Sequence, residues 1–204
     1  MKKLAAVGRI LALMFMFTLA GSAHATTDVA GIKFDDTAKV GTQDLKFNGA
    51  GIRYKAIFKV YAIGLYLQDR KGTAHDVFNA PGARRVQIGV LRDLSSEEFG
   101  RAFLAGINQN IDRNDKTKIV GQLLKFGEIF ASIPELKKGD IVTTDWVPGT
   151  GTVIQVNGKR IAEPLPDLQF YNAILKIWLG DKPVEPKLKQ AMLGEKPDEP
   201  SRNN

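Results

Sequence analysis

The chain has 204 residues, no cysteine and a formal net charge of +7, from 29 basic and 22 acidic residues. Without cysteine there is no thiol nucleophile, no disulfide and no cysteine-based metal site. The basic residues are scattered and no aromatic–basic ladder accompanies them, so nucleic-acid binding is not expected. The only histidines are His24 and His75, which excludes a histidine triad and a histidine-rich zinc site, and we expect neither a metal nor a cofactor.

The first 25 residues resemble a targeting segment rather than part of a fold. Lys2 and Lys3 give a basic start, residues 10–19 form a short apolar run, and small residues follow up to Ala25. This is the pattern of a secretory signal peptide cleaved after Ala25. The apolar run is too short for a bilayer span, which takes about 20 residues. We therefore expect a periplasmic protein without stable membrane insertion after cleavage.

Strand patterns come first in the remaining chain. Residues 29–34 ("VAGIKF") predict a short strand, and residues 44–54 ("DLKFNGAGIRY") lead into the aromatic and β-branched run 57–69. That run is apolar on both faces, as in a strand covered on both sides. Residues 84–92 ("RRVQIGVLR") alternate apolar and polar side chains and predict another strand.

Helical spacing follows at residue 95. Ser95 and Glu98 form a capping box before an apolar series that includes Phe99 and Phe103. A second helical series runs from 119 to 130, and residues 112–115 ("DRND") are interpreted as the turn between the two helices.

The apolar period then returns to two. Residues 140–147 and 151–163 predict antiparallel strands, with Asn157–Gly158 as a type I′ turn in the second segment. Residues 167–180 predict a helix with Tyr171 and Trp178 on one face, and Pro186 is placed to begin a last short helix.

This order of elements indicates an α+β fold in which helices pack on one face of a large antiparallel sheet. Residues 26–194 are predicted to form one domain, and residues 195–204 a frayed polar tail.

Arg53 is the residue that most needs an explanation, because it stands at the start of a long apolar run. If residues 53–67 form one extended strand, Arg53 and Tyr61 share a face and look into the same space. A guanidinium offers a fork of donors that matches a carboxylate, and a phenol adds another donor. Two readings stay open: an arginine at a sheet edge with its head in water, or a buried arginine that needs an anion.

The aromatic residues carry the same ambiguity. Tyr61 and Tyr171 are ordinary core residues by default, although each offers a hydroxyl. Phe99 and Phe103 are more simply core residues than the lining of an apolar ligand site.

At these residues the sequence resembles the chalcone isomerase-like superfamily, and most closely its secreted bacterial branch. Residues 49–67 ("GAGIRYKAIFKVYAIGLYL") are similar to its G-x-G-x-R…V-Y-x-x-G-x-Y segment. Residues 137–159 and 170–194 are similar to later blocks, so the resemblance spans about 29–194. It implies an open-faced β-sandwich, in which a large antiparallel sheet and a layer of helices enclose a ligand cleft. Plant members isomerise chalcones to flavanones, and other members bind fatty acids.

The resemblance also implies roles for particular residues. Arg53 matches the family arginine that faces the substrate oxyanion or the fatty-acid carboxylate, and Tyr61 matches the fatty-acid binders. The tyrosine and asparagine of the plant catalytic helix align with Phe99 and Gly106, which have no side-chain donor. Tyr171 falls near a plant serine or threonine and keeps a hydroxyl.

Three functional hypotheses follow. The first is a periplasmic protein that binds a small amphipathic carboxylate, such as a fatty acid, through Arg53, Tyr61 and Tyr171 with Phe99 and Phe103 as apolar walls. The second is an intramolecular-lyase isomerase of the chalcone isomerase type, in which Arg53 is catalytic. The third is a non-catalytic structural or interaction protein, in which Arg53 pairs with an internal carboxylate and no cavity opens beside it.

Overall fold

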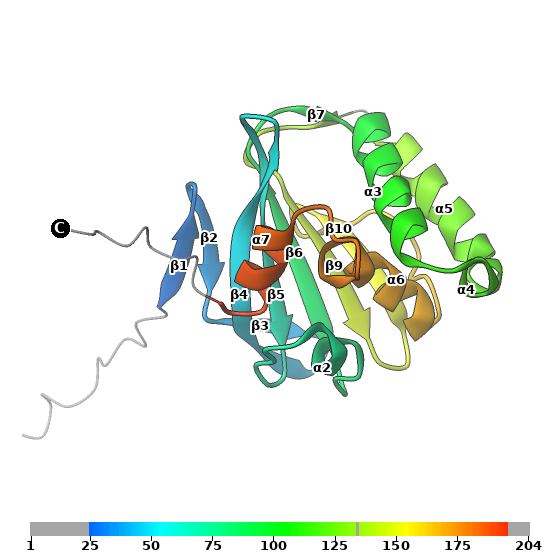
Figure 1. The fold of residues 1–204 in the computed structure, drawn as a ribbon, viewed down its shortest axis with the longest axis horizontal. Coiled ribbons are helices and arrows are strands. Elements are labelled where there is room, and N and C mark those ends of the chain that lie inside the picture. The colour runs from blue at the N-terminus through cyan, green and yellow to red at the C-terminus, as the bar shows by residue number, and fades with distance from the viewer. Residues whose placement is uncertain (1–24, 134, 196–204) are drawn as a thin grey trace, which may run out of the picture.

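The computed structural model describes residues 25–133 and 135–195, and its centre is an antiparallel sheet (Figure 1). Across this main sheet the strands lie in the order β11 (Lys159–Arg160), β10 (Gly151–Val156), β9 (Ile141–Val147), β6 (Arg84–Val90), β5 (Phe58–Leu67), β4 (Gln43–Lys55) and β3 (Thr37–Val40). Two small sheets flank it, formed by β1 (Thr26–Val29) with β2 (Ile32–Asp35) and by β7 (Leu94–Ser95) with β8 (Glu135–Leu136). The expected signal peptide up to His24 and the tail from residue 196 lie outside the described residues.

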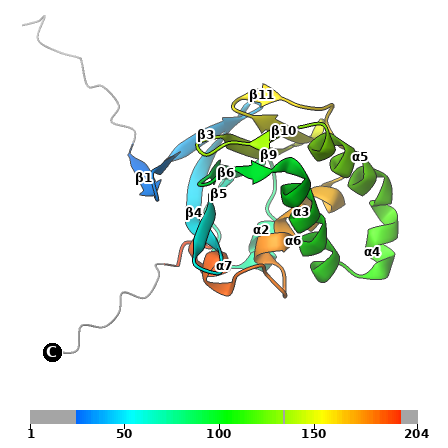
Figure 2. The ribbon, with the colours of Figure 1, turned by 90° about the horizontal axis from the view of Figure 1, so that it is seen from above.

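Helices gather on one face of the main sheet, which curls around them in Figure 2. They are α2 (Ala74–Phe78), α3 (Ser96–Asn110), α4 (Arg113–Lys118), α5 (Val120–Ala131), α6 (Leu168–Leu179) and α7 (Pro186–Met192). Helix α3 packs against both α5 and α6, and α7 packs on β4. The main apolar core lies between these helices and the sheet, which confirms the predicted α+β arrangement. None of the helices described here has the length and apolar character needed to cross a membrane.

Several local signals in the sequence act as predicted. The Ser95 hydroxyl accepts a hydrogen bond from the Glu98 backbone N–H at 3.1 Å, so the capping residue starts α3. Asn157 and Gly158 have φ of 51° and 77°, as a type I′ turn requires. Helix α7 begins at Pro186 and ends at Met192.

Two predictions about the ends of elements are wrong. The strand predicted over 29–34 is a hairpin, because Ala30 and Gly31 take φ of 56° and 87° and reverse the chain between β1 and β2. The turn predicted at 112–115 instead begins α4, where the Asp112 carboxylate accepts from the Asp115 N–H at 2.8 Å. In both places a short stretch of polar or small residues is compatible with two local conformations, and packing decides which one forms.

The extended run considered for residues 53–67 is also a hairpin. Ala56, with φ of 54°, and Ile57 form a tight turn between β4 and β5, closed by Lys55 opposite Phe58. Neither Ala nor Ile is a residue that tight turns favour, so composition gave no sign of a reversal here.

The glycines before Arg53 have a packing role. The extra residue of a β-bulge at Asn48 lies beside Gly49, and the Asn48 amide donates to the Met192 carbonyl at 2.8 Å. A Cβ on Gly51 would come within 2.8 Å of the Leu188 side chain. These residues therefore let α7 approach the β4 backbone, which places the segment before α7 next to Arg53.

Candidate functional site

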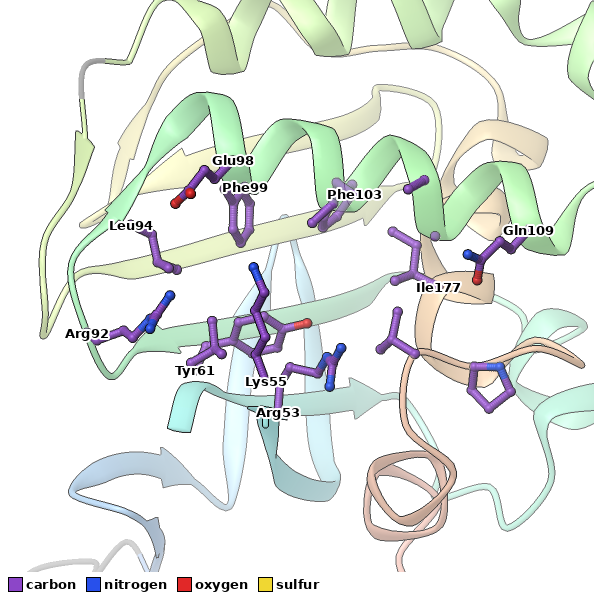
Figure 3. A pocket seen from close by; sticks show the side chains of 16 residues that line it. Arg53, Lys55, Tyr61, Arg92, Leu94, Glu98, Phe99, Phe103, Gln109 and Ile177 are labelled. Atoms are coloured by element: carbon purple, nitrogen blue, oxygen red, sulfur yellow. The ribbon is translucent and has the colours of Figure 1, made fainter. Parts of the chain in front are cut away.

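A cavity of about 460 Å³ lies between the β4–β5 hairpin, α3 and the segment that joins α6 to α7 (Figure 3). Its apolar walls include Val60, Phe99, Phe103, Ile177 and Val184. Its polar lining consists of Arg53, Lys55, Arg92, Glu98 and Gln109. Three cations and one carboxylate give the lining a net charge of 3 − 1 = +2, so its charge favours an anionic group at one end of an apolar ligand.

Arg53 and Tyr61 meet in this cavity because they are paired across the hairpin. Arg53 on β4 lies opposite Tyr61 on β5 in the strand register, and both side chains line the cavity. Residues directly opposite in an antiparallel pair point to the same face. The structure thus brings the two together through a reversal of the chain, and not through one extended strand.

Tyr61 is held in place by a residue that the sequence placed only in the core. The indole N–H of Trp178, on α6, donates to the Tyr61 hydroxyl oxygen at 3.0 Å. Burial raises the pKa of Tyr61 to about 12, against the smaller opposing effects of the Trp178 hydrogen bond and the Arg53 charge. Tyr61 is therefore a neutral phenol at physiological pH. Because its oxygen already accepts from Trp178, its own proton is the part left to donate to a ligand.

Arg53 has only part of its hydrogen-bonding capacity used by the protein. Its Nη1 donates to the backbone carbonyl of Tyr54 and lies 3.4 Å from Oε2 of Glu185. The same Glu185 oxygen accepts from the Tyr54 N–H at 3.0 Å. Within the described residues, Nε and Nη2 of Arg53 make no hydrogen bond. The Arg53 side chain is 27% exposed. It is therefore neither an arginine with its head in water nor a fully buried one, and Glu185 uses only one of its donor groups.

The aromatic wall is a packed cluster. Phe103 stacks on Phe126 with ring centroids 4.9 Å apart and meets the edge of Trp178 at 5.4 Å. Phe99 lies 5.2 Å from Phe130. Phe99 and Phe103 are therefore both core residues and cavity lining. A wall fixed by ring packing keeps its shape without a ligand.

Tyr171 does not join this group. It is fully buried, its hydroxyl donates to the Thr144 carbonyl at 3.4 Å, and its ring packs near Trp146 rather than beside the cavity. Burial also raises its pKa far above the ordinary value for tyrosine. The expected third hydroxyl of the site is therefore a structural residue that ties α6 to β9.

Four residues near the site were not predicted from the sequence. They are Lys55, Arg92, Trp178 and Glu185. Lys55 was within reach of sequence reasoning, because it follows Arg53 by two positions on the same strand. The others come from distant parts of the chain and carry no local signal. No cluster of His, Asp and Glu in the part of the chain that the structure describes could hold a metal ion.

Comparison with known proteins identifies a family for the chain and a solved structure with a similar fold. A family model described as chalcone isomerase-like matches residues 26–194. The chain belongs to the chalcone isomerase-like family. The crystal structure of a fatty-acid binding protein from Arabidopsis thaliana superposes with a TM-score of 0.64 at 15% identity, covering 80% of this chain and 92% of that chain. At this identity the likeness shows the fold alone. A search of curated proteins gave no match.

Within this chalcone isomerase-like chain, α3 turns both Phe99 and Gly106 toward the cavity. These are the positions where the sequence resemblance places the tyrosine and asparagine of plant isomerases. A Cβ on Gly106 would come within 2.8 Å of the Ile177 side chain, so glycine there allows α3 and α6 to pack closely. These two positions therefore offer no side-chain hydrogen bond to a ligand, whereas Glu98 and Gln109 on the same helix also line the cavity.

Proposed function

We propose that this protein binds a small amphipathic carboxylate of the fatty-acid type, in the periplasm after removal of residues 1–25. The observation that carries the proposal is the placement of unused donors on Arg53 and Tyr61 side by side on one wall of a cavity that also has an aromatic wall. The ligand carboxylate accepts from the Arg53 guanidinium and the Tyr61 phenol. Its chain lies against Phe99 and Phe103.

The strength of the expected hydrogen bonds, the cavity volume and the charge of the lining support this arrangement. A charge-assisted hydrogen bond is worth about 1.5–3 kcal/mol, more than a neutral one. The cavity volume of about 460 Å³ is within the range of small-ligand sites. The net positive charge of the lining disfavours a cationic ligand and favours a carboxylate. The fatty-acid binding protein that shares the fold supports the ligand class by analogy.

The test is the binding of saturated fatty acids to purified protein, measured by calorimetry, together with native mass spectrometry of protein from its own host. We expect a co-purifying acyl acid and an affinity that falls about 10–100-fold in Arg53→Ala, since that variant loses the charge-assisted bonds. Arg101→Ala is the matched control, because Arg101 lies on α3 but is 65% exposed and pairs with Glu97. Equal affinities in the two variants would refute the carboxylate site.

The isomerase alternative differs in what it requires of the wall. Ring closure of a chalcone needs stabilisation of a phenolate, which Arg53 and Tyr61 can supply, but also a way to position the ring. Phe99 and Gly106 supply no polar anchor. We expect no acceleration of chalcone cyclisation over the spontaneous rate. The assay monitors the decrease in chalcone absorbance with time. Acceleration that Arg53→Ala abolishes would favour the enzyme instead.

The structural-protein alternative requires that Arg53 pair with an internal carboxylate and that no cavity open beside it. The structure meets the first condition only. Arg53 does contact an internal carboxylate, that of Glu185. A cavity nevertheless opens beside the pair, so the wall is not closed.

A further inference from the structure

The turn between β4 and β5 is the most exposed apolar feature of the described chain. It projects as a narrow loop at the top of Figure 1, drawn in cyan. Ile57 is 85% exposed and Phe58 is 57% exposed. The other exposed large apolar pair, Val120 and Leu124, lies on α5 away from the cavity. We call residues 55–59 ("KAIFK") the hairpin tip; every residue in it is exposed.

The chemistry of the hairpin tip is unusual for a turn. Tight hairpin turns favour Gly, Asn and Asp, which take positive φ easily and are polar. Here Ala56 takes φ of 54° and a β-branched Ile57 stands at the apex. Neither side chain stabilises the fold by burial. A position that breaks local rules without a structural gain is expected where function selects the residue.

The surroundings of the hairpin tip are basic. Residues 53–59 contain the three cations Arg53, Lys55 and Lys59 and no acidic residue. The Arg92 guanidinium lies 5.8 Å from the centre of the Phe58 ring, which adds a cation from the chain after β6. Among the acids on this side, Glu98 lines the cavity and Glu185 is already bonded to Tyr54 and Arg53. Asp93, next to Arg92 in the chain, pairs with Lys137. Two apolar side chains thus stand within a group of cations.

The hairpin tip is continuous with the mouth of the cavity. Lys55 and Arg92 belong to both, since each lines the cavity and each flanks the exposed apolar pair. A partner seated on Ile57 and Phe58 would therefore lie next to the entrance of the site.

We propose that the hairpin tip docks on an anionic lipid surface. Ile57 and Phe58 enter the interfacial layer, where short apolar side chains gain from leaving water. Lys55, Lys59 and Arg92 lie at the level of the lipid phosphates, which attract basic residues. A protein partner or second copy fits less well. A stable protein interface buries about 800 Å² on each partner, and two side chains provide far less area than that. This docking is peripheral and goes beyond the carboxylate site, which it does not require.

The experiment uses protein exported and processed by its host, with the start at residue 26 checked by intact mass. It is sedimented with vesicles of phosphatidylcholine containing about one third phosphatidylglycerol, and with vesicles of phosphatidylcholine alone. We expect binding to the anionic vesicles that weakens at least tenfold without phosphatidylglycerol and falls steeply with added salt. We expect the double variant Ile57→Ser/Phe58→Ser to bind anionic vesicles at least tenfold more weakly.

The matched control is Val120→Ser/Leu124→Ser, which removes the exposed apolar pair of α5, whose two residues are 49% and 65% exposed. It is expected to bind vesicles as the unaltered protein does. Circular dichroism melting checks that both variants fold, and a Phe58→Trp variant should show a blue-shifted emission on anionic vesicles only. Equal losses in the two double variants, binding that ignores lipid charge, or self-association removed by the tip variant would overturn the proposal.

Solution binding of fatty acid separates this proposal from the previous one. The tip variant should keep its affinity for a dissolved fatty acid, because neither Ile57 nor Phe58 lines the cavity. Loss of vesicle binding with retained ligand binding supports docking. Ligand binding without any vesicle binding overturns docking and leaves the carboxylate site standing.

Discussion

Two arginines of the main sheet meet their carboxylate partners in opposite ways. Arg85 on β6 donates from Nε and Nη2 to both oxygens of Asp145 on β9, at 2.7 and 2.6 Å. Arg53 on β4 reaches Glu185 with Nη1 alone, at 3.4 Å. The side chains of Arg85 and Arg53 are 17% and 27% exposed, so burial differs less than hydrogen bonding does.

The two arginines therefore differ mainly in the donors that remain unused within the described residues, and less in charge or depth. The bidentate Arg85 pair is complete, and it fixes the alignment of two neighbouring strands. Arg53 retains donors beside a cavity, so a ligand can use them without breaking the fold. The predictions below test whether these two arginines really divide into a structural and a ligand-binding one.

The largest effect is expected when the complete pair is broken. Asp145→Ala leaves Arg85 largely buried without its partner, which should lower the free energy of unfolding by about 4 kcal/mol. Arg53→Ala should change it by less than about 1 kcal/mol, because that pair is long and partly solvated. Urea denaturation of both variants measures the two values. Similar losses in the two would remove the distinction between the arginines.

Much of the fold could be predicted because its signals are local. Ser95 caps α3, Pro186 starts α7, and Asn157–Gly158 turns the last hairpin, each through geometry confined to a few residues. The order of such elements was then enough to indicate helices on one face of an antiparallel sheet.

The parts that could not be predicted depend on the partners that folding supplies. The Ala56–Ile57 turn has no residue that marks a reversal, so the cross-strand pairing of Arg53 with Tyr61 was not visible. Gly64 lies in β5 as predicted, but the reason for a glycine there is a distant partner: its missing side chain makes room for the ring of Phe34, whose nearest atom would lie 2.6 Å from a Cβ at this position.

Some residues of the site could likewise be predicted from the sequence, and others could not. The resemblance of residues 49–67 to the family pointed to Arg53 and Tyr61, which do line the cavity. The resemblance at the later residues 170–194 also pointed to Tyr171, whose hydroxyl contacts Thr144 instead of the cavity. Glu185 comes from another part of the chain, 132 positions from Arg53, and nothing in its local sequence predicts the contact.

The next effect concerns the phenol beside Arg53. Folded Tyr61 keeps its proton to about pH 12, whereas an unfolded tyrosine loses it near pH 10. The unfolded state therefore releases a proton first, and the stability that Tyr61 contributes is present below pH 10 and is lost as the pH rises toward 12. Between pH 10 and 12 the loss is about 2–3 kcal/mol, since one pH unit corresponds to about 1.4 kcal/mol.

Tyr61→Phe should flatten this alkaline part of the stability curve, measured by urea denaturation between pH 8 and 12. Tyr66 and Tyr171 also have raised pKa values through burial, but both remain in the variant and cancel in the comparison. At pH 8 the variant should be about 1 kcal/mol less stable, because the Trp178 N–H loses its acceptor. Parallel curves would show that the phenol is not the buried neutral donor that the site requires.

The smallest effect distinguishes Glu185 as a competitor from Glu185 as a support. Its carboxylate occupies Arg53 in the free protein, so Glu185→Gln should release Arg53 for the ligand and keep an oxygen for the Tyr54 N–H. We expect fatty-acid affinity to rise about threefold, or about 0.7 kcal/mol, with little change in stability. Glu97→Gln is the control, since Glu97 also pairs with an arginine but does not line the cavity. Weaker binding in Glu185→Gln alone would mean that Glu185 orients Arg53, which would make the Arg53 pair a structural one like that of Arg85.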